Sequence, residues 1–457
     1  MKKVAFHNLG CKVNSYELDG IMQIFQNNGY EIVDFSQKAD VYVVNTCTVT
    51  NIADRKSRQM LHKAKAQNED AIVVATGCYA QTDTDGAIKD ESIDLIVGNN
   101  EKTKIYEYVE KYMQDRKIGG DDAKTLGGTT IGDISKDTEY ENFCIDKTNE
   151  HTRAYIKIQD GCNQFCSYCA IPLARGRVRS RDKADILVEV KKLSENGYQE
   201  VVVTGIHLSS YGIDFRQDGH DISYNAFAQG DAVNKELLDV LDAISRIEGI
   251  KRIRLGSLEP RLITDDFMES LVRIDKVCPH FHLSLQSGCD SVLKRMNRGY
   301  TASEYAKKVA LIRRYYEHPA ITTDIITGFP GETEEEFEET RKYAEEINLY
   351  ETHVFKYSRR KGTVADKLPG QHTDKIKSLR SRILIEESAK RMAQFAAYYV
   401  GKEVEVLVED EETVNGELYI TGYTPEYVRC MIKKRDDLDT IVKVKGQQVI
   451  DGSLYCV

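Results

Sequence analysis

The sequence predicts an α/β protein built from three units: an N-terminal parallel α/β domain, a central partial (β/α)6 barrel and a small C-terminal antiparallel β-barrel. Three observations predict this arrangement. Short apolar runs alternate with helical patterns at the start of the chain, six more strand-and-helix units follow, and the last segment changes to the two-residue period of half-buried strands. A chain of 457 residues also exceeds one ordinary domain core, which agrees with several units.

The first unit, residues 1–116, repeats one strand-then-helix pattern four times. Such alternation predicts a parallel sheet covered by helices, with ligands bound beyond the carboxyl ends of the strands. The expected strands are 4–9, 41–46, 71–77 and 95–98, and the expected helices are 15–28, 52–66, 80–89 and 101–114. Residues 117–150 then become polar and glycine-rich, which predicts an exposed linker.

The central unit, residues 151–374, again alternates strands with helices such as 184–195 and 334–347. Six repeats of this kind predict an open barrel whose loops meet at one face. Residues 212–235 have little periodicity and are expected to form a long loop at that face. The expected strands are 154–159, 200–204, 252–256, 281–285, 321–326 and 352–357.

A single amphipathic helix is predicted over residues 375–401, where it connects the barrel to the last unit. Residues 402–457 then alternate apolar and polar positions, which predicts a small antiparallel barrel. Barrels of this size commonly bind single-stranded nucleic acid, and the alternative is a purely structural cap. The expected strands are 403–408, 417–422, 427–432 and 441–445.

Composition indicates a globular protein, with 41% hydrophobic and 30% charged residues. No apolar run approaches the roughly 18 residues of a membrane span, and the N-terminus is too polar for a signal peptide. We therefore expect a cytoplasmic protein without a membrane partner. The net charge of −10 disfavours a nucleic-acid partner, but two local basic clusters are as consistent with contact with an anionic polymer as with a merely solvated face. They are Arg175, Arg177, Arg179, Arg181 and Lys183, and Lys356, Arg359, Arg360 and Lys361.

Three cysteines, Cys162, Cys166 and Cys169, follow the expected strand 154–159 with spacings of three and two residues. A structural zinc site normally closes with four protein ligands, whereas three thiolates on an iron-sulfur cluster leave one iron open. This spacing therefore predicts a cluster with an open iron. The alternatives are a structural zinc loop and three cysteines that pack as small apolar residues.

Three further cysteines, Cys11, Cys47 and Cys78, each lie just beyond an expected strand of the first unit. The carboxyl ends of parallel strands meet at one edge of a sheet, so these thiols are expected to converge on one crevice. The sequence thus predicts a second three-thiolate cluster site. Taken singly, each of these cysteines is better explained as an ordinary buried residue, and only their recurrence after three strands favours a cluster site.

Four residues at or near strand ends of the central unit are candidates for a cofactor pocket: Gly205, Glu259, Gln286 and Asp324. They lie among small residues, which let the backbone approach a ligand, and polar residues, which orient it. Polar residues after a strand can instead serve the local structure. Thr333 and Glu336, for example, have the spacing of a helix capping box.

The cysteine motif, continued as Tyr168-Cys169-Ala170-Ile171-Pro172 and Arg175-Gly176, resembles the radical S-adenosylmethionine enzymes, and the order of all six cysteines resembles the methylthiotransferases within them. The resemblance covers essentially the whole chain and implies a C-terminal TRAM domain. It implies two 4Fe-4S clusters, with Cys162, Cys166 and Cys169 on the one that binds S-adenosylmethionine and Cys11, Cys47 and Cys78 on an auxiliary one. It also places Tyr168 beside S-adenosylmethionine, which serves as methyl donor and radical source.

Two segments, 9–17 and 204–212, resemble the branch that acts on N6-threonylcarbamoyladenosine at position 37 of tRNA, beside the anticodon. The implied partners are tRNA, a reducing protein such as flavodoxin or ferredoxin, and a sulfur source. The expected RNA contacts are Arg175, Arg177 and Arg179 and, in the last unit, Arg429 and Lys433. Alternative substrates are isopentenyladenosine in tRNA and a ribosomal-protein aspartate, and an alternative class is an iron-sulfur RNA-binding protein without turnover.

Overall fold

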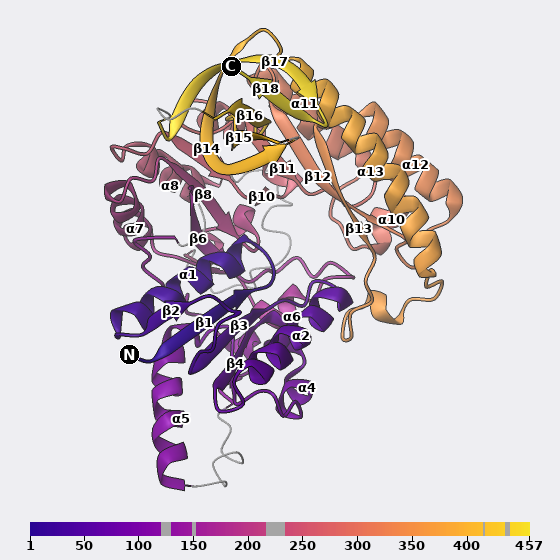
Figure 1. Ribbon diagram of the computed structural model, residues 1–457. Coiled ribbons are helices and arrows are strands. Elements are labelled where there is room, and N and C mark those ends of the chain that lie inside the picture. Colours follow the sequence, from indigo (N-terminus) through magenta and orange to yellow (C-terminus); the bar gives the residue numbers. More distant parts are fainter. Residues whose placement is uncertain (120–128, 149–151, 216–233, 415, 435–438) are drawn as a thin grey trace.

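The computed structural model describes residues 1–119, 129–148, 152–215, 234–414, 416–434 and 439–457, in three connected units (Figure 1). The N-terminal unit contains a five-stranded, fully parallel sheet with strand order β2-β1-β3-β4-β5. Its strands are β1 (Lys3–Asn8), β2 (Glu31–Val33), β3 (Val41–Thr46), β4 (Ile72–Gly77) and β5 (Leu95–Val97). Its helices are α1 (Lys12–Asn27), α2 (Asn51–Gln67), α3 (Cys78–Thr82), α4 (Thr84–Ile88) and α5 (Ile105–Gly119).

Helices cover both faces of this sheet, which explains why its central strands are almost wholly apolar. Alternate residues of β3 point to opposite faces, so Val43 packs with α1 and α5 while Tyr42 packs with α2, α3 and α4. The predicted parallel sheet is therefore confirmed. Two details differ from the prediction: β2 was not expected, and the expected helix 80–89 is divided between α3 and α4.

Part of the predicted linker 117–150 is not exposed, which corrects that expectation. Residues 120–128 and 149–151 lie outside the described residues, but Ile134, Phe143 and Ile145 are buried. Phe143 packs against Gly20 of α1, where an added Cβ would lie 2.4 Å from the aromatic ring. The polar composition of this segment hides the three apolar side chains that anchor it.

The central unit has six parallel strand positions, as predicted, arranged as two four-stranded sheets. Strands β9 and β10 are separated only by Gly256, and β9 pairs with β8 while β10 pairs with β11, so one curved surface runs through both sheets. The strands are β6 (Ala154–Asp160), β7 (Arg179–Ser180), β8 (Glu200–Gly205), β9 (Arg252–Leu255), β10 (Ser257–Leu258), β11 (His280–Leu283), β12 (Ala320–Thr327) and β13 (Glu351–Lys356).

The helices of this unit begin with side-chain caps at several positions, including the predicted capping box of Thr333 and Glu336. Residues 216–233 of the expected long loop lie outside the described residues. The helices are α6 (Ile171–Arg175), α7 (Lys183–Glu195), α8 (Lys235–Ser245), α9 (Asp265–Leu271), α10 (Asp290–Arg295), α11 (Ala302–Tyr315) and α12 (Glu334–Glu346). Short 3-10 turns occupy Lys102–Lys104, Ile134–Lys136, Leu208–Ser210, Ile213–Phe215, Pro260–Leu262 and Ala365–Lys367.

The connecting helix α13 (Asp374–Ala397) leads into a closed barrel of five strands in the order β14-β15-β16-β18-β17. Its strands are β14 (Glu403–Val414), β15 (Glu417–Tyr423), β16 (Arg429–Lys433), β17 (Ile441–Ile450) and β18 (Ser453–Cys456). Strand β18 was not predicted, and it pairs in parallel with β16, so the barrel is antiparallel at every pair but one.

The C-terminal barrel packs against the amino ends of the central strands (Figure 1). Tyr427 stacks on His280 at the start of β11, with ring centroids 4.8 Å apart, and Arg252 at the start of β9 donates to Glu405 at 2.8 Å. The N-terminal unit therefore lies at the opposite, carboxyl ends of the central strands. Within the described part of the chain, every helix falls short of the length and apolarity needed to cross a membrane.

Replacing Phe143 by alanine tests whether the segment around it is anchored to α1. The side chain is buried among Tyr16 and other core residues, so its removal is expected to lower the free energy of unfolding by about 3 kcal/mol, the lower end for such changes. Urea denaturation measures this. Lys147→Ala, an exposed position in the same segment, is expected to change stability by less than about 0.5 kcal/mol. Equal stability of the Phe143 variant and the wild type would contradict the anchoring.

Candidate functional site

The first cysteine loop begins where β6 ends, and a returning segment of chain holds it closed. Gly161 has a φ of 69°, and an added Cβ there would lie 1.7 Å from the carbonyl oxygen of Arg177, so only glycine fits. The Cys162 amide donates to the carbonyl of Gly176 at 3.1 Å, and the Cys169 amide donates to that of Cys166 at 3.0 Å. These bonds fold the loop so that Cys162, Cys166 and Cys169 lie near one another.

The thiols of this loop are largely buried and lie close to one another. Burial, reinforced by the neighbouring Cys166 thiol, raises the pKa of Cys162 to about 12, and burial with the other two cysteines raises the pKa of Cys169 as well. Three thiolates so close together need positive charge, which the iron of a cluster supplies. Arg298 also donates to the sulfur of Cys166 at 3.2 Å.

The second triad lies at the carboxyl edge of the N-terminal sheet. Cys11 follows β1 and Cys47 follows β3, the two strands that flank the switch point of a 2-1-3-4-5 order, and Cys78 follows β4. An added Cβ on Gly10 would lie 3.3 Å from Cβ of Cys47, so the two loops touch. Burial raises the pKa of Cys47 to about 12, with smaller contributions from Cys78 and Cys11. The structure therefore brings these three cysteines together, as the strand pattern predicted.

Both triads fit a polynuclear cluster by their donor chemistry. Among the described residues, no three His, Cys, Asp or Glu side chains are grouped as ligands of a single metal ion. An iron-sulfur cluster instead takes each thiolate on a different iron. Beside the first triad, the buried Nε2 of His207 has no hydrogen-bond partner within the described structure, and burial, with Arg298 and Arg261 nearby, lowers the pKa of His207 to about 3. Nδ1 of this imidazole is hydrogen-bonded to the Ser210 hydroxyl at 2.6 Å, so a neutral ring with only Nε2 unpaired fits a pocket for a bound group.

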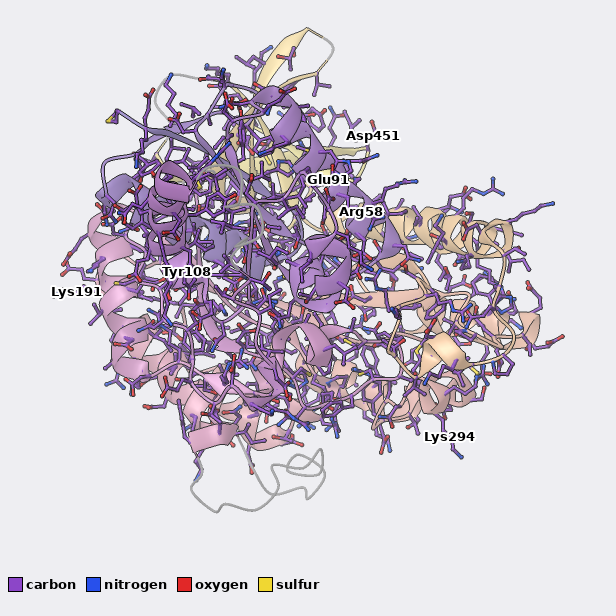
Figure 2. All side chains as sticks on the ribbon, turned by 90° about the horizontal axis from the view of Figure 1, so that it is seen from below. Arg58, Glu91, Tyr108, Lys191, Lys294 and Asp451 are labelled. Carbon is purple, nitrogen blue, oxygen red and sulfur yellow. The ribbon has the colours of Figure 1, made fainter. Side chains whose placement is uncertain are left out.

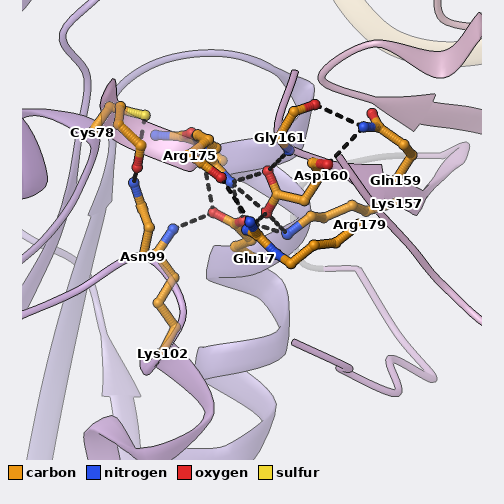
Figure 3. Close-up of polar contacts among 12 residues, drawn as sticks. Glu17, Cys78, Asn99, Lys102, Lys157, Gln159, Asp160, Gly161, Arg175 and Arg179 are labelled. Carbon is orange, nitrogen blue, oxygen red and sulfur yellow. Dashed lines mark hydrogen bonds and ion pairs between the residues drawn. The ribbon is translucent and has the colours of Figure 1, made fainter. Parts of the chain in front are cut away.

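A buried charge network joins the two cysteine sites (Figure 3). Glu17 of α1 accepts from Lys157 at 2.7 Å and from Arg175 at 3.0 Å, and Lys102 is a third partner. Asp160 pairs with Lys157 at 2.5 Å and with Arg175 at 3.2 Å. Burial alone raises the pKa of Glu17, but the three cations, Arg175 above all, hold it well below the ordinary value.

This network contacts both triads through amide side chains. Asn14, three residues after Cys11, accepts from Arg175 at 2.8 Å, and Arg175 follows Cys169 by six residues. Asn99 donates to the carbonyl of Ala174 at 2.7 Å and lies 3.9 Å from the sulfur of Cys78. Four cations (Lys102, Lys157, Arg175 and Arg179) face two carboxylates, which leaves two positive charges in excess. That excess suits three neighbouring thiolates.

The burial of the network corrects the predicted RNA contacts. The residues Arg175 and Arg179 are 0% and 1% exposed and paired with carboxylates, so they do not present charge to an RNA backbone. Arg181 is likewise buried against Glu189. Arg177 is exposed and lies over the ring of Phe165, 4.5 Å from its centroid. In the C-terminal barrel, Arg429 and Lys433 reach the surface, where they pair with Glu412 and Glu417.

A cavity of about 230 Å³ lies between the two cysteine loops. Its wall combines the residues after Cys47, the first cysteine loop, and the ends of β12 and β13. The lining residues are Thr48, Val49, Thr50, Tyr168, Cys169, Ala170, Ile171, Gln286, Asp324, Ile326, Phe355, Lys356, Tyr357 and Ser358. This is the arrangement that a reaction between two fixed centres requires, because a bound group reaches both at once.

The predicted cofactor residues divide into two groups. Tyr168, Gln286 and Asp324 line the cavity. Glu259 lies outside that lining and pairs with Arg261 at 2.8 Å, which in turn donates to Gln164 of the cysteine loop. Gly205 is packed against Gln159, 2.9 Å from an added Cβ.

Three functional neighbours were missed: Asn14, Asn99 and Arg298. Each acts through a contact distant in sequence, and none belongs to a spacing that marks it.

Two family models match the chain. The one described as "Uncharacterized protein family UPF0004" matches residues 3–98, and that of the Radical SAM superfamily matches residues 156–344. The chain is also similar to the solved radical S-adenosylmethionine methyltransferase TsrM from Kitasatospora setae, at 15% identity and a TM-score of 0.54, covering 91% of this chain and 79% of that one. This likeness concerns the fold alone.

Curated relatives extend the match to nearly the whole chain. The threonylcarbamoyladenosine tRNA methylthiotransferase MtaB of Bacillus subtilis is 41% identical, covering 97% of this chain and 94% of the relative. The protein of the same name from Aquifex aeolicus is 40% identical over 92% and 95%. A tRNA-2-methylthio-N(6)-dimethylallyladenosine synthase from Thermoanaerobacter sp. is 34% identical over 89% and 83%.

Glu17→Gln tests the buried network through its pH dependence. Breaking one partner of a buried ion cluster is expected to lower the free energy of unfolding by about 3 kcal/mol at pH 7. Because the folded pKa of Glu17 is depressed, its charge stabilises the fold above the unfolded pKa of about 4.3 and ceases to do so as the pH falls further. The difference in the free energy of unfolding between the variant and the wild type, measured by urea denaturation, should therefore decrease below about pH 5. The exposed Glu195→Gln is the control, and a gap independent of pH would refute the depressed pKa.

Proposed function

The chain belongs to the radical S-adenosylmethionine methylthiotransferase family, and we propose that it transfers a methylthio group to carbon 2 of N6-threonylcarbamoyladenosine at position 37 of tRNA. The observation that carries the proposal is the cavity walled on one side by the Cys47 loop and on the other by the Cys162–Cys169 loop. Relatives named for this substrate are 32 to 41% identical and those named for dimethylallyladenosine are 30 to 34% identical, and the two relatives at 40 and 41% both carry the first name.

The target carbon explains why two cysteine sites are needed. The hydrogen on carbon 2 of adenine has no useful acidity, so a side chain acting as a base cannot activate it. Cys162, Cys166 and Cys169 would hold one 4Fe-4S cluster, which with S-adenosylmethionine would supply radical chemistry, and Cys11, Cys47 and Cys78 would hold a second, which would supply the sulfur of the methylthio group. The protein's own contribution is to hold the target base between them.

The cavity lining is suited to a purine base. Phe355, which is 45% exposed, and Tyr168 offer aromatic surface for stacking, and Val49, Ile171 and Ile326 exclude water. Gln286 has a φ of 76° and is held in it by backbone bonds to Asp324 and Ile326, at 2.8 and 2.9 Å. We propose that Gln286 and Asp324 orient polar groups of the base or of S-adenosylmethionine.

We propose that exposed lysines in and after the last strand of the central unit bind the RNA backbone. Lys356 lines the cavity and Lys361 follows five residues later, and both side chains are exposed. Arg177, Arg429 and Lys433 remain proposed contacts at the surface. A reducing protein such as flavodoxin or ferredoxin, a sulfur source and a cytoplasmic location are part of the same proposal, as the chemistry needs electrons and sulfur in a reducing compartment.

Nucleoside mass spectrometry of tRNA from cells lacking the gene, complemented with variants, tests the chemistry and the substrate together. Cys11→Ala and Cys162→Ala are each expected to abolish 2-methylthio-N6-threonylcarbamoyladenosine, because each removes one ligand of a triad. Cys144→Ala, an exposed cysteine outside both triads, should retain the product. If the methylthio form of isopentenyladenosine is lost instead, the substrate is isopentenyladenosine. Unchanged product in the Cys11 variant would refute the auxiliary site.

Removal of the two lysines tests the RNA surface. Lys356→Ala with Lys361→Ala is expected to weaken tRNA binding and to reduce the slope of log K against log salt by about 0.7 for each lost phosphate contact. Fluorescence anisotropy over a salt series measures both. Lys191→Ala is the matched control, since this exposed lysine of α7 lies at the outer edge of the molecule (Figure 2). An unchanged slope in the double variant would exclude this surface.

A further inference from the structure

We infer that residues 358–365, here called the bridging segment, fix the position of one cysteine loop relative to the other, with Arg360 as the positioning residue. This inference rests on the proposed function, since it concerns the geometry between the two centres. The segment follows β13 and its first residue, Ser358, lines the cavity. It contacts the loop after Cys47 at one end and the first cysteine loop at the other.

At the N-terminal unit, Arg360 is the main contact. Its guanidinium donates to the side chain of Asn51 at 2.8 Å, pairs with Asp54 at 2.7 Å, and bonds the hydroxyl of Thr48. Ser358 adds a fourth bond by accepting from the Asn51 amide at 2.9 Å. Thr48 directly follows Cys47, so these bonds hold the backbone of a predicted cluster ligand.

At the first cysteine loop, the far end of the segment makes the contact. The Ala365 amide donates to the carbonyl of Ser167 at 2.7 Å, and Ser167 lies between Cys166 and Cys169. Gly362, at a φ of 88°, turns the chain close to Leu173 of α6, 3.1 Å from an added Cβ. The Thr363 hydroxyl donates to the carbonyl of Arg360 at 2.7 Å and closes the turn between the two ends.

Arginine is the residue type that this role requires. Its planar fork satisfies Thr48, Asn51 and Asp54 at once, whereas a lysine ammonium is a single point of charge. The side chain is 10% exposed and Asp54 is 16% exposed, so the pair is shielded from solvent. The Glu17 network joins the same two units elsewhere, so loss of Arg360 is expected to loosen the Cys47 loop without separating the units.

A displaced Cys47 loop has a defined kinetic consequence. Cleavage of S-adenosylmethionine at the first triad needs only the central unit, but sulfur transfer needs both cysteine loops correctly placed relative to each other. Misplacement by about 1 Å is enough to reduce such a reaction about 100-fold. Loss of Arg360 should therefore uncouple cleavage from transfer, whereas a general folding defect would lower both equally.

The experiment uses full-length Arg360→Gln, Arg360→Lys and Asp54→Asn proteins carrying reconstituted clusters. We measure 5′-deoxyadenosine and methylthiolated nucleoside in the same reactions. Each variant should form at least about 10-fold more 5′-deoxyadenosine per product than the wild type, while its cleavage rate falls less than about 3-fold. Arg382→Gln, an exposed arginine of α13, is the control and should keep the wild-type ratio.

A second readout needs no clusters. Hydrogen exchange in the apoprotein should be faster at residues 48–54 in the Arg360 variants, because the side chains of Thr48, Asn51 and Asp54 lose the guanidinium that anchors them. An unchanged ratio together with unchanged exchange would overturn the inference, as would an equal fall of cleavage and product. If the wild type methylthiolates a different nucleoside, the proposed substrate fails and the ratio is measured on that nucleoside. If no nucleoside is methylthiolated, the proposed function fails, and exchange at residues 48–54 alone decides the inference.

Discussion

Glu17 is a fully buried carboxylate whose oxygens are shared by Lys102, Lys157 and Arg175, and the relation between the N-terminal and central units depends on it. The carboxylate comes from α1, directly after the Cys11 loop, while Lys157 and Arg175 flank the first cysteine loop. Charges so deeply buried are stable only when paired, so a shift of one unit against the other would leave buried ions without their partners. The network thereby orients two separately folded cysteine sites toward one cavity.

Strand geometry explains how six cysteines from distant parts of the sequence reach the two sites beside that cavity. Apart from β7, which pairs antiparallel with β6, the strands of both units are parallel, and their carboxyl ends carry the loops that hold Cys11, Cys47, Cys78 and the first triad. This much follows from sequence, because a buried parallel strand is a continuous apolar run and the cysteine comes directly after it. The positions of the strands and both triads were predictable for that reason.

The roles of the arginines were not predictable in the same way. The alternating residues Arg175, Arg177 and Arg179 look alike in sequence, yet two are buried and one is exposed. What separates them is the presence of Glu17 and Asp160, which approach only through tertiary packing. The same reason applies to Glu259, whose strand-end position suggested a ligand but whose partner is Arg261. Phe143 and β18 were missed because one apolar residue, or a four-residue strand, gives no periodic signal.

The distribution of charged residues between the buried site and the surface then matters more than the net charge of the protein. Near the site the buried cations are arginines and lysines paired with carboxylates, and they supply position and a local positive excess for thiolates. The exposed Lys356 lines the cavity and Lys361, five residues later, is also exposed, so the backbone of a bound RNA would meet these two cations. A net charge of −10 is therefore compatible with an anionic substrate, because the field that RNA meets is set by a few unpaired surface cations. Arg360, placed between those lysines in sequence but buried between the loops, belongs to the first group, and one short segment thus serves both substrate docking and the alignment of the two centres.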